Sequence, residues 1–123
     1  MNKIKLGKLG EDCAERFLIS QSHHPLERNY YCRFGEIDLI TFDYPNRQIV
    51  FTEVKTRTNI EFGLPQEALT ARKKSKILKT ALHFLSLKYA HSLISWRIDL
   101  IAVQLNEKNC LKEIEHFKNI LNG

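Results

Sequence analysis

The chain has 123 residues and a formal net charge of +5, and hydrophobic and charged residues make up 43% and 27% of it. This length and composition predict one globular domain, exclude a low-complexity chain, and favour a polyanionic partner. No apolar run is long enough for a signal peptide or a membrane span, so we expect a cytoplasmic protein with no membrane partner.

The first predicted element is a helix over residues 6–21, in which apolar residues recur at helical spacing. Its stripe contains Leu6, Leu9, Cys13 and Phe17. Glu11 lies at the edge of that stripe, from which its carboxylate would reach the rim of a sheet. A solvated glutamate is the alternative interpretation of this position.

Residues 26–33 predict the first strand, with two arginines around a pair of tyrosines. Arginine suits bidentate contacts with phosphate, and tyrosine stacks on unpaired bases. For Tyr30 and Tyr31 we expect the commoner outcome, a place in the core. Arg33 lies just before the next strand and is a candidate nucleic-acid contact.

A hairpin follows, formed by residues 35–40 and 50–55 around a Pro-Asn turn. Both arms alternate in the manner of strands and are rich in β-branched or aromatic residues. A hairpin that folds symmetrically about this turn places Asp38 opposite Glu53. Lys55 points the same way as Glu53, roughly 7 Å further along the strand.

Two opposed carboxylates need a positive charge between them, because they repel by about 4 kcal/mol at a separation of about 4 Å and an effective dielectric of 20. Lys55 supplies one charge, and a divalent cation would supply the rest. Hard cations such as Mg²⁺ bind carboxylates together with substrate phosphates. The pattern therefore indicates a metal site that hydrolyses phosphodiesters. A solvated hairpin, with a bulge between Asp38 and Glu53, is the alternative.

Residues 56–65 predict a polar loop in which Arg57 and Phe62 are candidate substrate contacts. Thr70 then suits the N-cap of a helix that runs to about residue 89. The expected apolar stripe of this helix contains Ala71, Leu78, Leu82, Leu85 and Tyr89, and its basic face contains Arg72, Lys73, Lys76, Lys79 and His83.

Cations in the first turns of a helix oppose its macrodipole. Their presence here favours phosphate binding by Arg72, Lys73 and Lys76, with a merely solvated face as the alternative. Further on, the apolar run at residues 94–104 predicts an inner strand. Within that run, Arg97 and Asp99 share a face and would form an ion pair. Residues 111–117 fit either a last strand or a short helix.

Asp38 and the triplet Glu53-Val54-Lys55 resemble the PD-(D/E)XK signature of the restriction-endonuclease-like superfamily. The wider context resembles the YraN family of small bacterial predicted endonucleases over nearly the whole chain. It comprises RNYYCR at 28–33, GEIDLI at 35–40, FTEVKTR at 51–57, FGLP at 62–65 and RIDLIAV at 97–103. The proline that opens the superfamily signature is absent, because Ile37 precedes Asp38.

The order of elements and the resemblance both predict an α/β fold, a restriction-endonuclease-like α-β-β-β-α-β sandwich with a central mixed sheet, as a single domain over residues 1–123. The resemblance implies a Mg²⁺- or Mn²⁺-dependent endonuclease that hydrolyses DNA. Asp38, Glu53 and the Val54 carbonyl would hold the metal, and Lys55 would orient the attacking water or stabilise the developing charge. In related junction-resolving nucleases a glutamate of the first helix joins the site, and Glu11 stands at that position.

We expect no separate recognition module, and hence selectivity for branched, nicked or single-stranded DNA. A homodimer would follow if both strands of a symmetric junction are cut. The alternative is a non-catalytic DNA-binding or scaffold protein that keeps the fold, and a nuclease acting on RNA is a third interpretation. Intact Asp38, Glu53 and Lys55 favour catalysis, since a binding module has no need of opposed carboxylates.

Overall fold

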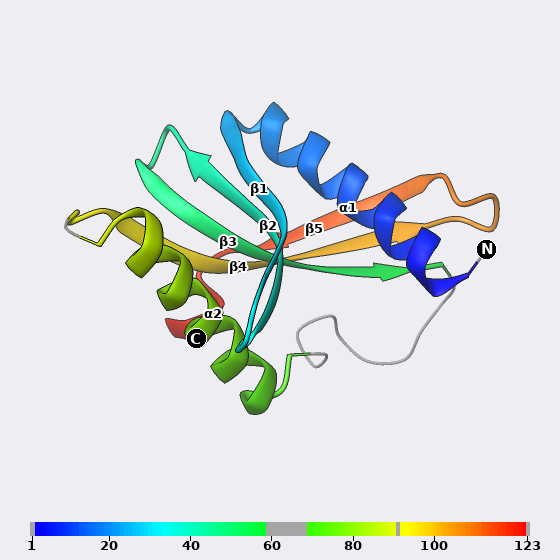
Figure 1. Ribbon diagram of the computed structural model, residues 1–123. Coiled ribbons are helices and arrows are strands. Elements are labelled where there is room, and N and C mark those ends of the chain that lie inside the picture. The colour runs from blue at the N-terminus through cyan, green and yellow to red at the C-terminus, as the bar shows by residue number, and fades with distance from the viewer. Residues whose placement is uncertain (1, 59–68, 91, 123) are drawn as a thin grey trace.

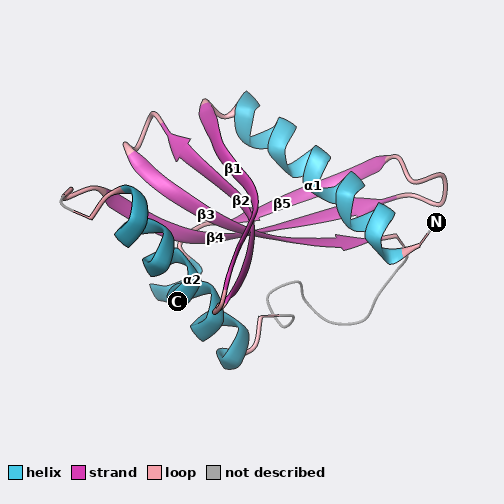
Figure 2. Ribbon diagram, viewed as in Figure 1, coloured by secondary structure: helices cyan, strands magenta, loops and turns pink. Residues whose placement is uncertain are grey.

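The computed structural model describes residues 2–58, 69–90 and 92–122. It contains a five-stranded mixed sheet with one long helix on each face (Figure 1, Figure 2). The elements in chain order are α1 (Lys3–Ser20), β1 (His23–Cys32), β2 (Gly35–Asp43), β3 (Gln48–Arg57), α2 (Ala71–Lys88), β4 (Ser95–Leu105), β5 (Leu111–Phe117) and the short 3-10 helix η2 (Ile120–Asn122). The predicted α-β-β-β-α-β order is confirmed. In the described ranges no helix combines the length and the apolar character needed to cross a membrane.

The strands lie in the order β1-β2-β3-β4-β5, so the hairpin of β2 and β3 occupies the interior of the sheet. β3 and β4 are parallel, with α2 between them in the chain, and the other neighbours are antiparallel. β4 lies between β3 and β5, which confirms the inner strand. Residues 111–117 form a strand, which decides between the two predicted alternatives.

The two helices cover opposite faces of this sheet (Figure 1). Ala14 and Leu18 of α1 are fully buried against one face. Ile77, Ala81 and Phe84 of α2 are buried against the other face. The strands are therefore held between two apolar layers, and a polar side chain inside the sheet can stay wet only at its rims.

Both helices begin at a capping side chain. Oδ1 of Asn2 accepts a hydrogen bond from the Lys5 N–H at 2.9 Å, and Oγ1 of Thr70 accepts one from the Lys73 N–H at 3.2 Å. Each cap is worth about 1 kcal/mol. The Thr70 cap is thus confirmed, whereas α1 begins at Lys3 rather than at residue 6 because Asn2 provides an earlier cap.

The buried face of α2 differs from the predicted stripe. Thr80 and Ala81 are fully buried, whereas Ala71 is exposed and Leu82 keeps 48% of its surface exposed. The Thr80 hydroxyl donates to the Lys76 carbonyl at 2.8 Å, so its burial leaves no donor unsatisfied. The prediction is confirmed for Leu78, Leu85 and Tyr89, which pack against the core. It was wrong for Ala71 and Leu82, because small residues bring the helix against the sheet.

At Asn29 in β1 and at Asp38 in β2, the side-chain alternation shifts, so that the side of each strand that faced α1 now faces α2. Leu39 belongs to the core cluster of α1, whereas Ile37, two residues away, belongs to that of α2, together with Tyr30. A regular strand would place residues 37 and 39 on one face. Asn29, at φ 53, has a left-handed backbone that asparagine tolerates better than most residues. Past this kink, the tip of the β1–β2 hairpin reaches toward α2 (Figure 1).

The two tyrosines of β1 have different environments. The hydroxyl of Tyr30 lies 2.7 Å from Nδ1 of His83, and its ring packs edge-on against Phe84 at 5.2 Å between centroids. Its predicted place in the core is confirmed. The prediction was wrong for Tyr31, which is 78% exposed, because successive strand residues point to opposite faces.

Candidate active site

The hairpin of β2 and β3 pairs in the predicted register. Residues 39–43 of β2 pair with residues 52–48 of β3 as an antiparallel ladder. The next position of the same register brings Asp38 and Glu53 opposite one another. The predicted alternation and the turn therefore place these two residues at the end of the ladder, inside the sheet.

Where this ladder ends, a side chain takes the place of a backbone carbonyl as the hydrogen-bond acceptor. Oδ2 of Asp38 accepts a hydrogen bond from the Val54 N–H at 2.7 Å, beyond the last pair, Leu39 with Thr52. A strand residue directs its N–H and its C=O toward the same neighbouring strand. The Val54 carbonyl therefore points into the gap that holds the Asp38 carboxylate.

Burial raises the pKa of both carboxyl groups, that of Asp38 to about 6 and that of Glu53 to about 8. The charge of Asp38 raises the pKa of Glu53 further, while the hydrogen bond from Val54 opposes the rise at Asp38. The two carboxyl groups also share a hydrogen bond. At neutral pH the pair therefore holds about one proton between its members.

Neither Asp38 nor Glu53 forms an ion pair with a lysine or arginine in residues 2–58, 69–90 and 92–122. The contacts that compensate them are the hydrogen bond between the two carboxyl groups and the one from the Val54 N–H. A divalent cation would replace the proton and bind both carboxylates, in the manner typical of Mg²⁺ sites that also hold substrate phosphate. The donor set, two carboxylates and a backbone carbonyl, fits a hard cation.

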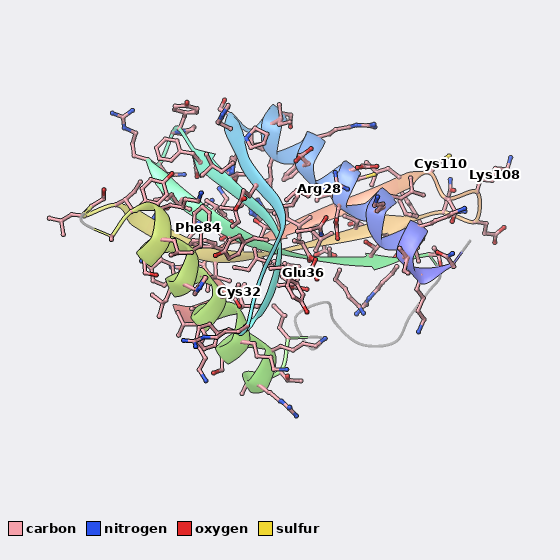
Figure 3. The ribbon with its side chains drawn as sticks, in the orientation of Figure 1. Arg28, Cys32, Glu36, Phe84, Lys108 and Cys110 are labelled. Carbon is pink, nitrogen blue, oxygen red and sulfur yellow. The ribbon has the colours of Figure 1, made fainter. Side chains whose placement is uncertain are left out.

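Two further acidic side chains surround this pair. The negative charges of Glu11 and Glu36 both raise the pKa of Asp38. Nδ2 of Asn29 donates to Oε1 of Glu11 at 3.1 Å and to Oε1 of Glu36 at 3.0 Å. Figure 3 shows Glu36 projecting from the β1–β2 hairpin. The structure thus brings the predicted Glu11 to the rim of the site, with an amide between it and Glu36.

Arg28 joins α1 to β1 beside this cluster (Figure 3). Its Nη1 lies 2.7 Å from Oδ1 of Asp12, and its Nε lies 3.4 Å from Oε1 of Glu11. Its Nη2 donates to the Lys8 carbonyl at 3.2 Å. These contacts tie the middle of α1 to β1 and hold Glu11 in place.

Among the residues that the structure describes, no three His, Cys, Asp or Glu side chains lie close enough together to hold a metal ion. Asp38 and Glu53 therefore stand as a two-carboxylate set. Glu11 and Glu36 act on the pair through their charge and are held by Asn29 and Arg28. Two protein carboxylates are a common complement for Mg²⁺, which keeps several waters and substrate oxygens.

Two lysines belong to the surroundings of the pair. Lys55 follows Glu53 by two residues on β3, so both side chains share one face, and each is partly exposed. Lys73, in the first turn of α2, lowers the pKa of Glu53 through its charge. The amino end of α2 therefore lies near the carboxylates.

The other predicted nucleic-acid contacts lie on the surface around this point. Arg72 and Lys76 are exposed on α2, and Arg33 is exposed with its guanidinium 4.7 Å from the centre of the Phe34 ring. Arg57 is partly buried at the end of β3. Phe62 lies outside the described residues.

Asn29 is the site residue that the sequence analysis missed. Its left-handed φ and its two acceptors become visible only when α1, β1 and β2 are together. The one signal in the sequence is its residue type, because asparagine is enriched in this conformation. A single asparagine in a predicted strand is too weak a signal to reveal a kink.

Comparison with known proteins assigns the family. The model of the family described as "Uncharacterised protein family UPF0102" matches residues 10–103. A UPF0102 protein of Caldanaerobacter subterraneus subsp. tengcongensis is 42% identical over 120 residues, covering 97% of this chain and 96% of the relative. UPF0102 proteins of Desulforamulus reducens and Pelotomaculum thermopropionicum are 39% and 40% identical, over 94% and 93% of this chain and 94% and 92% of their own lengths. The chain therefore belongs to the uncharacterised protein family UPF0102, which is the YraN family that its sequence resembles.

Proposed function

We propose that this protein is a metal-dependent endonuclease that hydrolyses DNA phosphodiester bonds. The observation that carries the proposal is the half-buried pair of Asp38 and Glu53 at the end of the β2–β3 ladder. Its carboxyl groups are hydrogen-bonded to one another, Asp38 accepts from the Val54 N–H, and neither residue has an ion-pair partner among the described residues. Such a pair is costly in a protein that only needs to be stable, because each carboxylate disfavours the charge of the other.

Asp38, Glu53 and the Val54 carbonyl would hold the metal, which when bound lowers the pKa of a coordinated water and neutralises charge on a phosphate oxygen. The Val54 N–H keeps the Asp38 carboxylate oriented before the metal binds. Lys55, on the face of Glu53, orients the attacking water or stabilises the charge that develops on the phosphate. Glu11, held by Arg28 and Asn29, keeps the rim of the site negative and supports a divalent cation.

The amino end of α2 would bind the phosphate backbone beside the scissile bond. Arg72, Lys73 and Lys76 are exposed, and the charge of Lys73 already acts on Glu53. Each cation at this end of a helix destabilises it by a few tenths of a kcal/mol through the macrodipole. A bound polyanion would offset this loss. The net charge of +5 agrees with such a ligand.

The test is a panel of labelled single-stranded, duplex, flap and four-way DNA, incubated with the purified protein in Mg²⁺ or Mn²⁺. We expect cleavage of at least one substrate with unpaired or branched DNA, and no cleavage in EDTA or with Asp38→Asn. If the parent binds these DNAs but cuts none of them, the protein is a non-catalytic DNA-binding protein with this fold. RNA versions of the single strand test the remaining alternative.

A further inference from the structure

Tyr31 is a large aromatic side chain that the fold leaves in solvent. It keeps 78% of its surface exposed, although its neighbour Tyr30 is packed on α2 and hydrogen-bonded to His83. Its ring takes part in none of the ring contacts found among the described residues. The packing of the sheet therefore does not account for an aromatic residue at this position.

The side chain of Tyr31 lies on the same side as the acidic cluster. Tyr31 is paired with Glu36 across β1 and β2, and directly paired residues of antiparallel strands share a face. Glu36 in turn accepts from Asn29, which stands opposite Asp38 in the same register. Along β1, Tyr31 is two residues from Asn29, or roughly 7 Å. An extended nucleotide spans such a distance.

Positive charges flank this hairpin tip. Arg33 follows two residues later, with its guanidinium 4.7 Å from the centre of the Phe34 ring. The tip rests on α2, because a Cβ at Gly35 would lie 3.9 Å from Cβ of Lys76. Tyr31 thus exposes an aromatic face two residues from the exposed Arg33. Proteins that bind single-stranded nucleic acid combine such stacking faces with cations that meet the phosphates.

We propose that Tyr31 is a stacking platform for an unpaired base of single-stranded DNA, next to the phosphate that water would attack at the site of Asp38 and Glu53. This inference rests on the proposed function and adds the substrate class to it. A duplex keeps its bases stacked on one another, so it cannot use the platform. Tyr31 therefore makes the protein prefer single strands and the unpaired parts of branched DNA.

The first test is binding, measured in EDTA by fluorescence anisotropy with a labelled thymidine oligonucleotide and a blunt duplex of equal length. Tyr31→Ala should weaken single-strand binding about 5- to 100-fold, which is the range for one stacked base, and change duplex binding less than twofold. Tyr31→Phe keeps the ring and should bind like the parent. Tyr44→Ala is the matched control, since Tyr44 is also exposed, at 54%, but lies at the other end of β2.

The second test locates the contact without relying on affinity. An oligonucleotide that carries 5-iododeoxyuridine should photocrosslink to the peptide that contains Tyr31, and mass spectrometry identifies the residue. Unchanged single-strand binding by Tyr31→Ala, an equal loss on duplex, no single-strand binding by the parent, or a crosslink only elsewhere would each overturn the inference. Cleavage is measured separately, so a parent that stacks DNA on Tyr31 but never cuts it refutes the nuclease and leaves the platform standing.

Discussion

The Val54 N–H donates to Oδ2 of Asp38 over 2.7 Å, at the point where the backbone ladder between β2 and β3 has ended. One hydrogen bond thus orients a carboxylate and leaves the Val54 carbonyl facing the same gap. The kink at Asn29 and Asp38 makes this possible, because it opens β2 away from β3 while both strands remain inside the sheet.

The first prediction concerns pH in EDTA. Unfolded Asp and Glu have pKa values of about 3.9 and 4.3, whereas folding raises the pKa of Asp38 to about 6 and that of Glu53 to about 8. The folded protein therefore keeps protons that the unfolded chain releases, and its stability falls as the pH rises from about 4 to about 8. Glu53→Gln should reduce this fall by about 1–3 kcal/mol, allowing for solvent screening.

Urea denaturation at a series of pH values measures this dependence. Glu113→Gln, an exposed glutamate on β5, is the control and should leave the dependence unchanged. The difference between parent and variant isolates the pair from other titrating groups, including His23, whose pKa is lowered mainly by burial. Identical curves for parent and Glu53→Gln would show that the two carboxyl groups do not share a proton.

The second prediction concerns the contact between α1 and β3. A Cβ at Gly10 would lie 1.7 Å from Oγ1 and 2.8 Å from Cβ of Thr56, whereas a Cβ at Gly7 meets nothing within 4 Å. Gly10→Ala should therefore destabilise the protein by about 1–3 kcal/mol through overpacking. Gly7→Ala, in the same helix, should stabilise it by about 0.5–1 kcal/mol. Thermal or urea unfolding measures the stability of both variants. Equal changes in the two would contradict the close approach of α1 to β3 at Gly10.

Much of the fold follows from local signals. The alternation of the hairpin arms and the Pro-Asn turn set the register that opposes Asp38 and Glu53, and Thr70 set the start of α2. The kink at Asn29 could not be predicted, because it depends on two strands changing the helix on which they pack. Alternation along β1 allows only one of Tyr30 and Tyr31 to face α2, and the change of packing determines that it is Tyr30. The buried face of α2 was predicted only in part, through Leu78, Leu85 and Tyr89. A hydrophobic stripe does not reveal that small residues such as Thr80 and Ala81 allow close packing.

The third prediction concerns the phosphate backbone. If Lys73 and Lys76 meet phosphates, the logarithm of DNA affinity should fall with the logarithm of salt concentration less steeply in Lys73→Ala/Lys76→Ala, by up to about 2 in slope, near 0.9 per contact. Lys112→Ala/Lys118→Ala removes the same charge from exposed positions in and after β5 and is the control. If both double variants change the slope equally, the effect comes from net charge and not from contacts made by α2.

The fourth prediction concerns the buried ion pairs on the α1 face. Arg97 bonds Asp99 at 3.0 Å and Asp43 at 2.8 Å, and His116 lies 2.7 Å from Asp99. Burial opposes the charge of Asp99, but the hydrogen bonds from His116, the Asn119 N–H and Arg97 leave its pKa below the ordinary value. Arg97→Met leaves two buried carboxylates without their cation and should cost about 3–5 kcal/mol.

Urea unfolding measures this cost, and Arg97→Met with Asp43→Asn should regain part of it, because the second change removes one uncompensated charge. Asp43 has a pKa lowered to about 2, where hydrogen bonds from Asn46 and Arg97 outweigh burial, so the stability it contributes is present at neutral pH and is lost as the pH falls toward 2. If Arg97→Met leaves the free energy of unfolding almost unchanged, the network contributes little to stability.

The central claim is that Asp38, Glu53 and Lys55 form a site for phosphodiester hydrolysis. Its most direct test is single-turnover cleavage of the best DNA of the panel in Mn²⁺. Parent, Glu53→Gln, Lys55→Ala and the control Glu113→Gln are each used in excess over the DNA, at protein concentrations that saturate it. We expect a rate lower by at least about 10²-fold in Glu53→Gln and in Lys55→Ala, and no change in Glu113→Gln. Cleavage by Glu53→Gln and Lys55→Ala at the rate of the parent would contradict it.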